Sequence, residues 1–171
     1  MMSPKMVDAL NQQINREMYS AYLYMAMSAD ATTQGLKGFA NWFYVQYQEE
    51  MVHAMKIYAY LHDQNQRVVL QAIEQPPTEF GKPLEMFQAT LKHEQYITQS
   101  INDLMDLAIE LRDHATQIFL QWYVTEQIEE EGNDNAIIDQ LKMIGDGHGL
   151  FMIDKELAAR VFVPPAAGTG A

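Results

Sequence analysis

The middle of the chain contains a segment, DQNQRVVLQAIEQPPTEFGKP (residues 63–83), whose composition differs from the sequence on either side. It includes three prolines and one glycine, whereas residues 39–62 before it and 84–111 after it include neither residue type. Because proline and glycine interrupt helices, we expect a long helix on each side of this connection. Some twenty residues at about 3.3 Å each can run the length of a helix bundle, which would make the second and third helices parallel.

Two shorter breaks complete the division of the chain. Gly35 and Gly38 mark a turn, and GDGHG (residues 145–149) ends the last long run. We therefore predict helices over about residues 4–33, 39–62, 84–111 and 115–144, with a short fifth helix over residues 150–161. The predicted fold is all-α: a four-helix bundle with one long crossover between helices 2 and 3 and a short fifth helix. We expect one domain over residues 1–162 and a flexible tail over residues 163–171.

Composition excludes several classes of protein. The 171 residues contain no cysteine, which rules out disulfides, thiolate metal sites and iron–sulfur clusters. The formal net charge of −12 disfavours nucleic acid as a partner and favours cations. No apolar leader and no run of eighteen apolar residues is present, so we expect no membrane partner and a cytoplasmic location.

Each long predicted helix has an apolar stripe that is interrupted near its middle by a carboxylate. These four residues are Glu17, Glu50, Glu94 and Glu130, and on the last helix Asp134 follows one turn later. An isolated buried carboxylate is costly unless it is protonated, paired or bound to a metal. The central stripes carry no lysine or arginine, and two divalent cations would balance four carboxylates. The pattern therefore predicts a dinuclear metal site inside the bundle.

The ligand types narrow the choice of metal. Glu50 and His53 are three residues apart, so they project from one face of a helix toward one metal. Carboxylates with one imidazole suit iron or manganese. On the fourth helix a second Glu-x-x-His is replaced by Gln127-Ile128-Glu129-Glu130, so the second metal lacks a histidine and is expected to be held less tightly.

With these motifs, the chain resembles the bacterial non-haem ferritins over residues 4–162. The residues that carry the resemblance are Glu17 with Tyr24, Glu49-Glu50 with His53, Glu94, Trp122, and Glu126-Gln127 with Glu129-Glu130. The resemblance implies a ferritin-like di-iron bundle. It also implies a ferroxidase that oxidises Fe(II) with dioxygen or hydrogen peroxide and stores ferric mineral in a hollow homo-oligomeric shell of twenty-four subunits.

The resemblance also implies which residues hold iron. The residues implied for the first iron are Glu17, Glu50 and His53, with Glu50 bridging to the second. Those implied for the second are Glu94 and Glu130, with Gln127 beside them. A third iron position would use Glu49, Glu126, Glu129 and the shared Glu130. Tyr24 would lie beside the iron pair and take part in electron transfer, and Trp122 would pack nearby.

Assembly into a shell gives three further expectations. The apolar stripe of the fifth helix, Leu150, Ile153, Leu157 and Val161, is expected to stay unburied within one bundle and to pack around four-fold axes. The β-prone residues 67–70 could pair across a two-fold interface. Surplus acids such as Glu131, Asp134 and Asp139 could line the cavity or its channels and attract Fe(II).

Several alternatives compete with this interpretation. Met51 lies between Glu50 and His53, where bacterioferritins place a haem-ligating methionine, so a haem-binding storage protein is the nearest rival. Bacterioferritins, however, carry a second Glu-x-x-His that this chain lacks. A rubrerythrin-like peroxidase would need cysteines. A cytokine-like bundle would act only as a binding partner and would not need four stripe carboxylates, and a ferritin subunit without oxidase activity would lack the ligands seen here.

Overall fold

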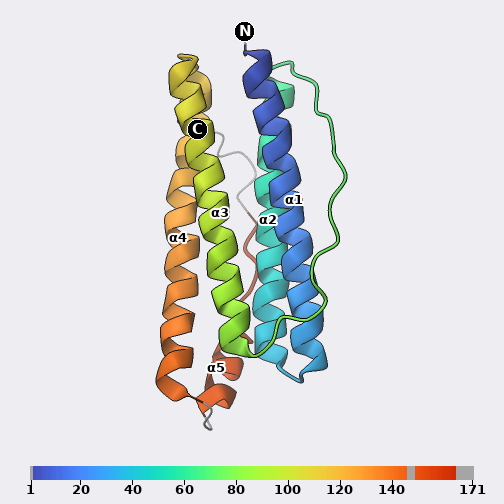
Figure 1. Cartoon of the computed structure of the whole chain (residues 1–171), viewed down its shortest axis with the longest axis vertical. Helices are drawn as coiled ribbons and strands as arrows, with labels where there is room; N and C mark the ends of the chain where they lie inside the picture. The colour runs from blue at the N-terminus through green and yellow to red at the C-terminus, as the bar shows by residue number, and fades with distance from the viewer. Residues whose placement is uncertain (1, 146–148, 165–171) are drawn as a thin grey trace.

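The structure, a computed structural model, describes residues 2–145 and 149–164 (Figure 1). Within these residues it contains five α-helices and no strand. The helices are α1 (Pro4–Thr33), α2 (Lys37–Asp63), α3 (Pro83–Glu110), α4 (His114–Ile144) and α5 (Gly149–Leu157). The predicted all-α bundle with one long crossover and a short fifth helix is confirmed.

The four long helices form two hairpins, α1 with α2 and α3 with α4, which pack side by side (Figure 1). Each hairpin has a short turn. In the first turn Gly35 has a φ of 79°, a value that glycine adopts without steric cost. At the second turn Asp113 caps α4, since its carboxylate accepts a hydrogen bond from the Thr116 amide at 3.1 Å. Helix α2 begins two residues before the predicted start, so Gly38 lies inside the helix.

The crossover runs along the outside of α1 from the end of α2 to the start of α3 (Figure 1). Asn11 of α1 holds it in place: its side chain donates to the Arg67 carbonyl at 3.2 Å and accepts from the Val69 amide at 2.8 Å. Asn15 donates to the Ala72 carbonyl at 3.0 Å. The Asn11 side chain of α1 thus satisfies backbone groups of the β-prone residues 67–70, and the pairing of these residues across an interface stays a prediction.

The core consists of two apolar clusters at opposite ends of the bundle. The cluster near α5 includes Tyr24, Phe39, Phe43 and Phe87, which are buried. The cluster at the other end is built from buried residues such as Met6, Leu10, Ile57, Leu61 and Leu120. Full burial of each large apolar side chain contributes about 1.5–3 kcal/mol, so the two ends provide the stability that a polar middle does not.

Helix α5 differs from its prediction in two ways. It ends at Leu157 rather than at residue 161. Ile153 and Leu157 are only 5% and 7% exposed, because they pack into the apolar cluster of their own bundle. The expectation that this stripe stays unburied within one bundle is therefore wrong for these residues, although Val161 is exposed.

The docking of α5 depends on a close approach of two backbones. Gly38 of α2 lies so near α5 that a Cβ atom on it would be 1.6 Å from the Asp154 carbonyl oxygen. The Asp154 carboxylate also accepts hydrogen bonds from the amides of Gly38, at 2.7 Å, and Phe39, at 3.1 Å. A glycine at position 38 thus lets α5 cap the first turn of α2.

No helix among the described residues is both long and apolar enough to cross a lipid bilayer. Most of the predicted glycine turn, residues 146–148, lies outside the described residues, and so do residues 165–171 of the predicted tail.

Candidate metal centre

The middle of the bundle, between the two apolar clusters, is polar. Seven predicted site residues from all four long helices meet there, and each is at most 4% exposed: Glu17, Tyr24, Glu50, His53, Glu94, Gln127 and Glu130. Buried carboxylates at this density need protons, hydrogen-bond donors or cations to balance them. The hydrogen bonds and ion pairs around these carboxylates show which of them the protein stabilises without a cation.

On the α1–α2 side, Glu17, Glu50 and His53 form a compact group whose ligand atoms all lie within 4.8 Å of one another. The His53 Nδ1 atom is 3.5 Å from Glu50 Oε2. Gln13 donates to Glu17 Oε1 at 2.8 Å, while Glu17 Oε2 is buried without a hydrogen-bond partner among the described residues. A carboxylate oxygen left unpaired beside an imidazole and a second carboxylate suits an iron or manganese cation.

On the α3–α4 side, the carboxylates are tied to neutral donors. Glu94 accepts hydrogen bonds from the Tyr24 hydroxyl and, at 2.9 Å, from the Gln127 amide. Glu130 accepts from the Gln46 amide at 2.8 Å. A second three-residue group consists of His53, Glu126 and Glu130, again with ligand atoms within 4.8 Å. Glu94 belongs to neither group, so this side is less ready to bind a cation than the α1–α2 side.

The residues predicted for a third iron differ in how near they lie to the centre and in what they contact. Glu126 lies 3.8 Å from His53 Nε2 and is partly exposed. Glu49 instead forms an ion pair with Arg160, whose Nη2 donates to Glu49 Oε2 at 2.5 Å. Glu129 is exposed and is part of neither three-residue group.

Arg160 is a site residue that the sequence did not reveal. It follows α5, yet its guanidinium reaches back to α2, where it donates to Gln46 Oε1 at 2.8 Å and lies 4.5 Å from the Trp42 ring centre. Through Gln46 it is connected to Glu130. The four stripe carboxylates form no ion pair with a lysine or arginine among the described residues, whereas Glu49, beside the stripe of α2, is paired with a cation from outside the four stripes.

Neighbouring residues hold the ligands in position. Gln13 and Gln46 each precede a site carboxylate by four residues, a spacing that could have indicated them. The Tyr123 hydroxyl donates to the His53 carbonyl at 2.7 Å, and the Trp122 ring centre is 5.3 Å from that of His53. Trp122 therefore packs beside the centre, as predicted.

Burial and crowding change the pKa values of these groups. Burial raises the pKa of Glu17, of Glu50 and of Glu94, and it raises the pKa of Glu130 to about 8 with the help of the nearby Glu94 charge. For His53 burial alone would lower the pKa, but Glu50 and Glu126 raise it well above its ordinary value. Without a cation the centre therefore retains protons, and a bound cation would displace them.

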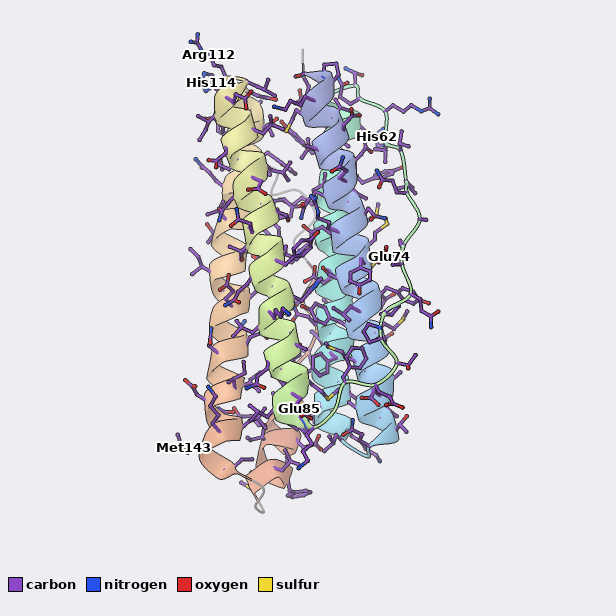
Figure 2. All side chains as sticks on the ribbon, in the orientation of Figure 1. His62, Glu74, Glu85, Arg112, His114 and Met143 are labelled. Atoms are coloured by element: carbon purple, nitrogen blue, oxygen red, sulfur yellow. The ribbon has the colours of Figure 1, made fainter. Side chains whose placement is uncertain are left out.

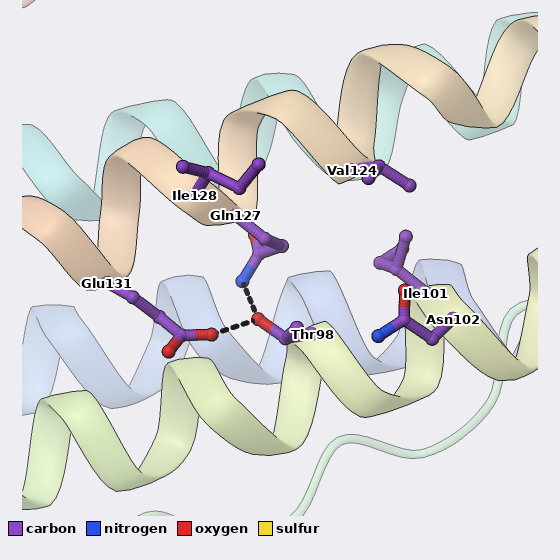
Figure 3. Close-up of a pocket in the computed structure, with 7 residues that line it drawn as sticks. All are labelled: Thr98, Ile101, Asn102, Val124, Gln127, Ile128 and Glu131. Carbon is purple, nitrogen blue, oxygen red and sulfur yellow. Dashed lines mark hydrogen bonds between the residues drawn. The ribbon is translucent and has the colours of Figure 1, made fainter.

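A hollow of about 340 Å³ opens between α3 and α4 at the edge of the centre (Figure 3). Gln127 lines it and approaches Thr98 Oγ1 at 3.4 Å, while Thr98 donates to Glu131 at 2.6 Å. Since Gln127 also donates to Glu94, its side chain connects the lining of the hollow with the buried carboxylates.

Comparison with known proteins agrees with this geometry. A sequence model of the ferritin-like domain, in the ferritin family, matches residues 7–144. Bacterial non-heme ferritins from Staphylococcus saprophyticus and Campylobacter jejuni are 43% and 42% identical, and the matches cover 95% and 91% of this chain and 98% and 93% of theirs. The chain belongs to the bacterial non-haem ferritins.

Solved structures support the same assignment for this ferritin. An open-pore ferritin from Archaeoglobus fulgidus superimposes with a TM-score of 0.93 at 46% identity, covering 94% of this chain and all of that one. A form of the same archaeal ferritin engineered to be closed gives a TM-score of 0.94 at 47% identity, covering 95% of this chain and all of that one. Membership of this family carries a general role in iron storage.

Proposed function

We propose that this ferritin is a ferroxidase that oxidises Fe(II) at a dinuclear centre within each subunit and stores the product as ferric mineral. Two Fe(II) ions supply two electrons, which reduce dioxygen to hydrogen peroxide or hydrogen peroxide to water. The observation that carries the proposal is the unpaired, buried Glu17 oxygen beside Glu50 and His53. No cationic side chain among the described residues forms an ion pair with Glu17 there, so a metal cation is the natural partner.

The iron positions follow from the two sides of the centre. One Fe(II) would bind Glu17, Glu50 and His53, the compact group that is already formed. The second would bind Glu94 and Glu130 with Gln127 beside it, after the hydrogen bonds from Tyr24, Gln127 and Gln46 rearrange. Glu50 lies between the two sides and would bridge the ions. Tyr24 would supply an electron or a proton through its contact with Glu94.

The third iron position needs larger changes. Glu49 would leave Arg160, and the exposed Glu129 would turn toward Glu126 and Glu130. Because both changes disrupt solvated or paired states, we expect this position to fill after the other two.

Mineral storage requires a container, which a packed four-helix bundle lacks, so we propose a cytoplasmic shell of twenty-four copies. Large apolar side chains that are exposed on the single chain support association. They include Tyr22, Met25, Tyr44, Met55, Phe151 and Met152. Phe151 and Met152 rather than Ile153 are the residues of α5 that are available to neighbours, since both are more than 65% exposed.

The test is anaerobic loading with Fe(II) followed by rapid mixing with air, monitored optically. We expect Glu50→Ala and His53→Ala each to remove the fast phase of oxidation, a loss on the order of 100-fold or more, because each deletes a ligand. His62→Ala is the matched control, since His62 is an exposed histidine on the same helix (Figure 2). Unchanged fast phases in both ligand variants would contradict the proposal.

The haem-binding alternative has one structural observation in its favour. Met51 lines an apolar hollow between α1 and α2 together with Met18, Tyr22 and Met25. The relatives, in contrast, are named as non-heme proteins. We therefore expect the purified protein to show no Soret absorption, and one stoichiometric haem that is lost in Met51→Leu would favour the alternative.

A further inference from the structure

Asp134 of α4 is a buried acid for which the dinuclear centre has no use. Its side chain belongs to a residue that is 1% exposed, and neither carboxylate oxygen has a hydrogen-bond partner among the described residues. The one other buried side-chain oxygen without a partner in the described part of the chain is Glu17 Oε2, which faces the proposed iron position. Asp134 therefore lacks a partner for two oxygens where Glu17 lacks one, and a cation would satisfy both residues.

The surroundings of Asp134 place it next to the centre. It follows Glu130 by four residues, so the two carboxylates lie on the same inward face of α4, with Cβ atoms about 5–6 Å apart. The charges that act on it most strongly are those of Glu94 on α3 and Glu130. Its own charge acts on the buried Tyr24 of α1. Asp134 is thus buried in the bundle, one helical turn beyond Glu130 toward the end of α4 that precedes α5.

Neighbouring basic side chains do not neutralise Asp134. Arg160 is near enough to stabilise its charge, but the guanidinium donates to Gln46, Glu49 and the Trp42 carbonyl. No ion pair of Asp134 occurs within residues 2–145 and 149–164. Thr98, whose hydroxyl lines the α3–α4 hollow, donates to Glu131.

We propose that Asp134 and Glu130 form an accessory cation position, one helical turn from the dinuclear centre on its α5 side. Two carboxylates, with the charge of Glu94 also acting on Asp134, make an oxygen-rich site that suits a divalent cation such as Fe(II) or Mn(II). Because Glu130 is shared, a cation can move between this position and the second iron position by exchanging one ligand at a time. The inference rests on the proposed function for the role of Glu130, whereas the unpaired state of Asp134 stands independently of it.

The probe for this position is Mn²⁺ alone, which binds oxygen ligands and is not oxidised by the protein during the measurement. We expect crystals of the full chain soaked in Mn²⁺ to show an anomalous peak within bonding distance of Asp134, in addition to peaks at Glu17, Glu50 and His53. In solution, titration followed by electron paramagnetic resonance should count one fewer bound Mn²⁺ per chain in Asp134→Asn than in the unchanged protein.

Two further variants control for charge and folding. Asp139→Asn removes an exposed acid of the same helix, paired with Lys142, and should leave the count unchanged. Asp134→Leu removes the carboxylate without adding an amide that could hold Glu130, and it should give the same loss as Asp134→Asn. Circular dichroism verifies that both Asp134 variants are folded. The anomalous peak in crystals of the unchanged protein tests the position without using either variant.

The outcomes separate this inference from the proposed function. Peaks at Glu17, Glu50 and His53 without one at Asp134, together with equal counts in all variants, would overturn the accessory position alone and make Asp134 a buried protonated acid. The absence of peaks at both places would overturn both proposals. A peak at Asp134 alone would support the accessory position and contradict the dinuclear centre.

Discussion

The two sides of the metal centre differ in how they hold their carboxylates without a cation. On the α1–α2 side, Glu17, Glu50 and His53 are gathered within 4.8 Å, and one oxygen is left unpaired. On the α3–α4 side, Glu94 and Glu130 are occupied by donors from Tyr24, Gln127 and Gln46. A cation entering the first side replaces protons only, whereas a cation entering the second must also displace hydrogen bonds. We therefore expect a cation to bind more weakly on the α3–α4 side and to leave it more readily.

The largest change in metal affinity should come from giving the α3–α4 side the same ligand types as the α1–α2 side. The double substitution Gln127→Glu with Glu130→His gives α4 the Glu-x-x-His spacing that α2 already has. We expect the second metal to bind on the order of 100-fold more tightly, because the pair of α4 ligands changes from a weak amide and a carboxylate to a carboxylate and an imidazole. Anaerobic Fe(II) titration measures the gain, and slower transfer of Fe(III) to the mineral should accompany it. Equal affinity before and after the change would show that the ligands do not cause the asymmetry.

A smaller effect, on the pH dependence of folding stability, should come from Asp134 in the metal-free protein. Burial, with Glu94 and Glu130, raises its pKa from 3.8 to about 9. The folded state then binds a proton that the unfolded state releases, so this group makes stability fall as pH rises from about 4 to about 9, by up to about 1.4 kcal/mol per pH unit. The charged or titratable groups around it are Tyr24 on α1, Glu94 on α3, Glu130 and Glu131 on α4, and Arg160 after α5.

Calorimetry in the presence of a chelator measures this dependence. Asp134→Asn should flatten the decline of melting temperature between pH 6 and pH 9, although Glu130, with a pKa of about 8, will leave part of the slope. Asp139→Asn should leave the slope unchanged. Parallel pH profiles for Asp134→Asn and the unchanged protein would mean that Asp134 is not buried as a protonated acid.

The smallest change in metal affinity should come from Arg160, which links the segment after α5 to Gln46 and Glu49 of α2. Arg160→Gln releases Glu49 and loosens Gln46, which holds Glu130. We expect the third metal position to bind Mn²⁺ more tightly, by less than about tenfold, because a partly exposed ion pair no longer competes for Glu49. Lys142→Gln, which removes an exposed lysine, is the control. Weaker binding in Arg160→Gln would instead make the arginine a support for the ligands.

The fold was largely predictable because its breaks are local. Prolines and glycines mark the crossover and the first turn, and the helix bounds agree to within about two residues at most ends. The four central carboxylates were also predictable, since apolar stripes with one acid each are a local pattern. Helix α5 was predicted too long, and its burial was missed because Gly38 and Asp154 interact across more than a hundred residues.

The site residues that could not be predicted also depend on contacts between residues far apart in the chain. Gln46 and Gln13 had a visible spacing to the acids, but Arg160 reaches Glu49 only after the chain has folded back over α2. Asp134 was noted as a surplus acid for a cavity or channel, and the structure places it inside the bundle instead. Whether Glu49 and Glu129 bind iron stays a prediction, because one is paired with Arg160 and the other is exposed.

The crossover is the sole covalent bridge between the α1–α2 and α3–α4 hairpins, and side-chain hydrogen bonds from Asn11 and Asn15 attach it to α1. Each hairpin brings half of the carboxylates to the shared interior. Cleavage near residue 75 would therefore yield a first fragment that keeps Glu17, Glu50 and His53 and a second that carries Glu94 and Glu130. Their recombination could be followed by recovery of metal affinity on the α3–α4 side. This ferritin thus offers a natural place to build a split reporter in which complementation restores the second cation position.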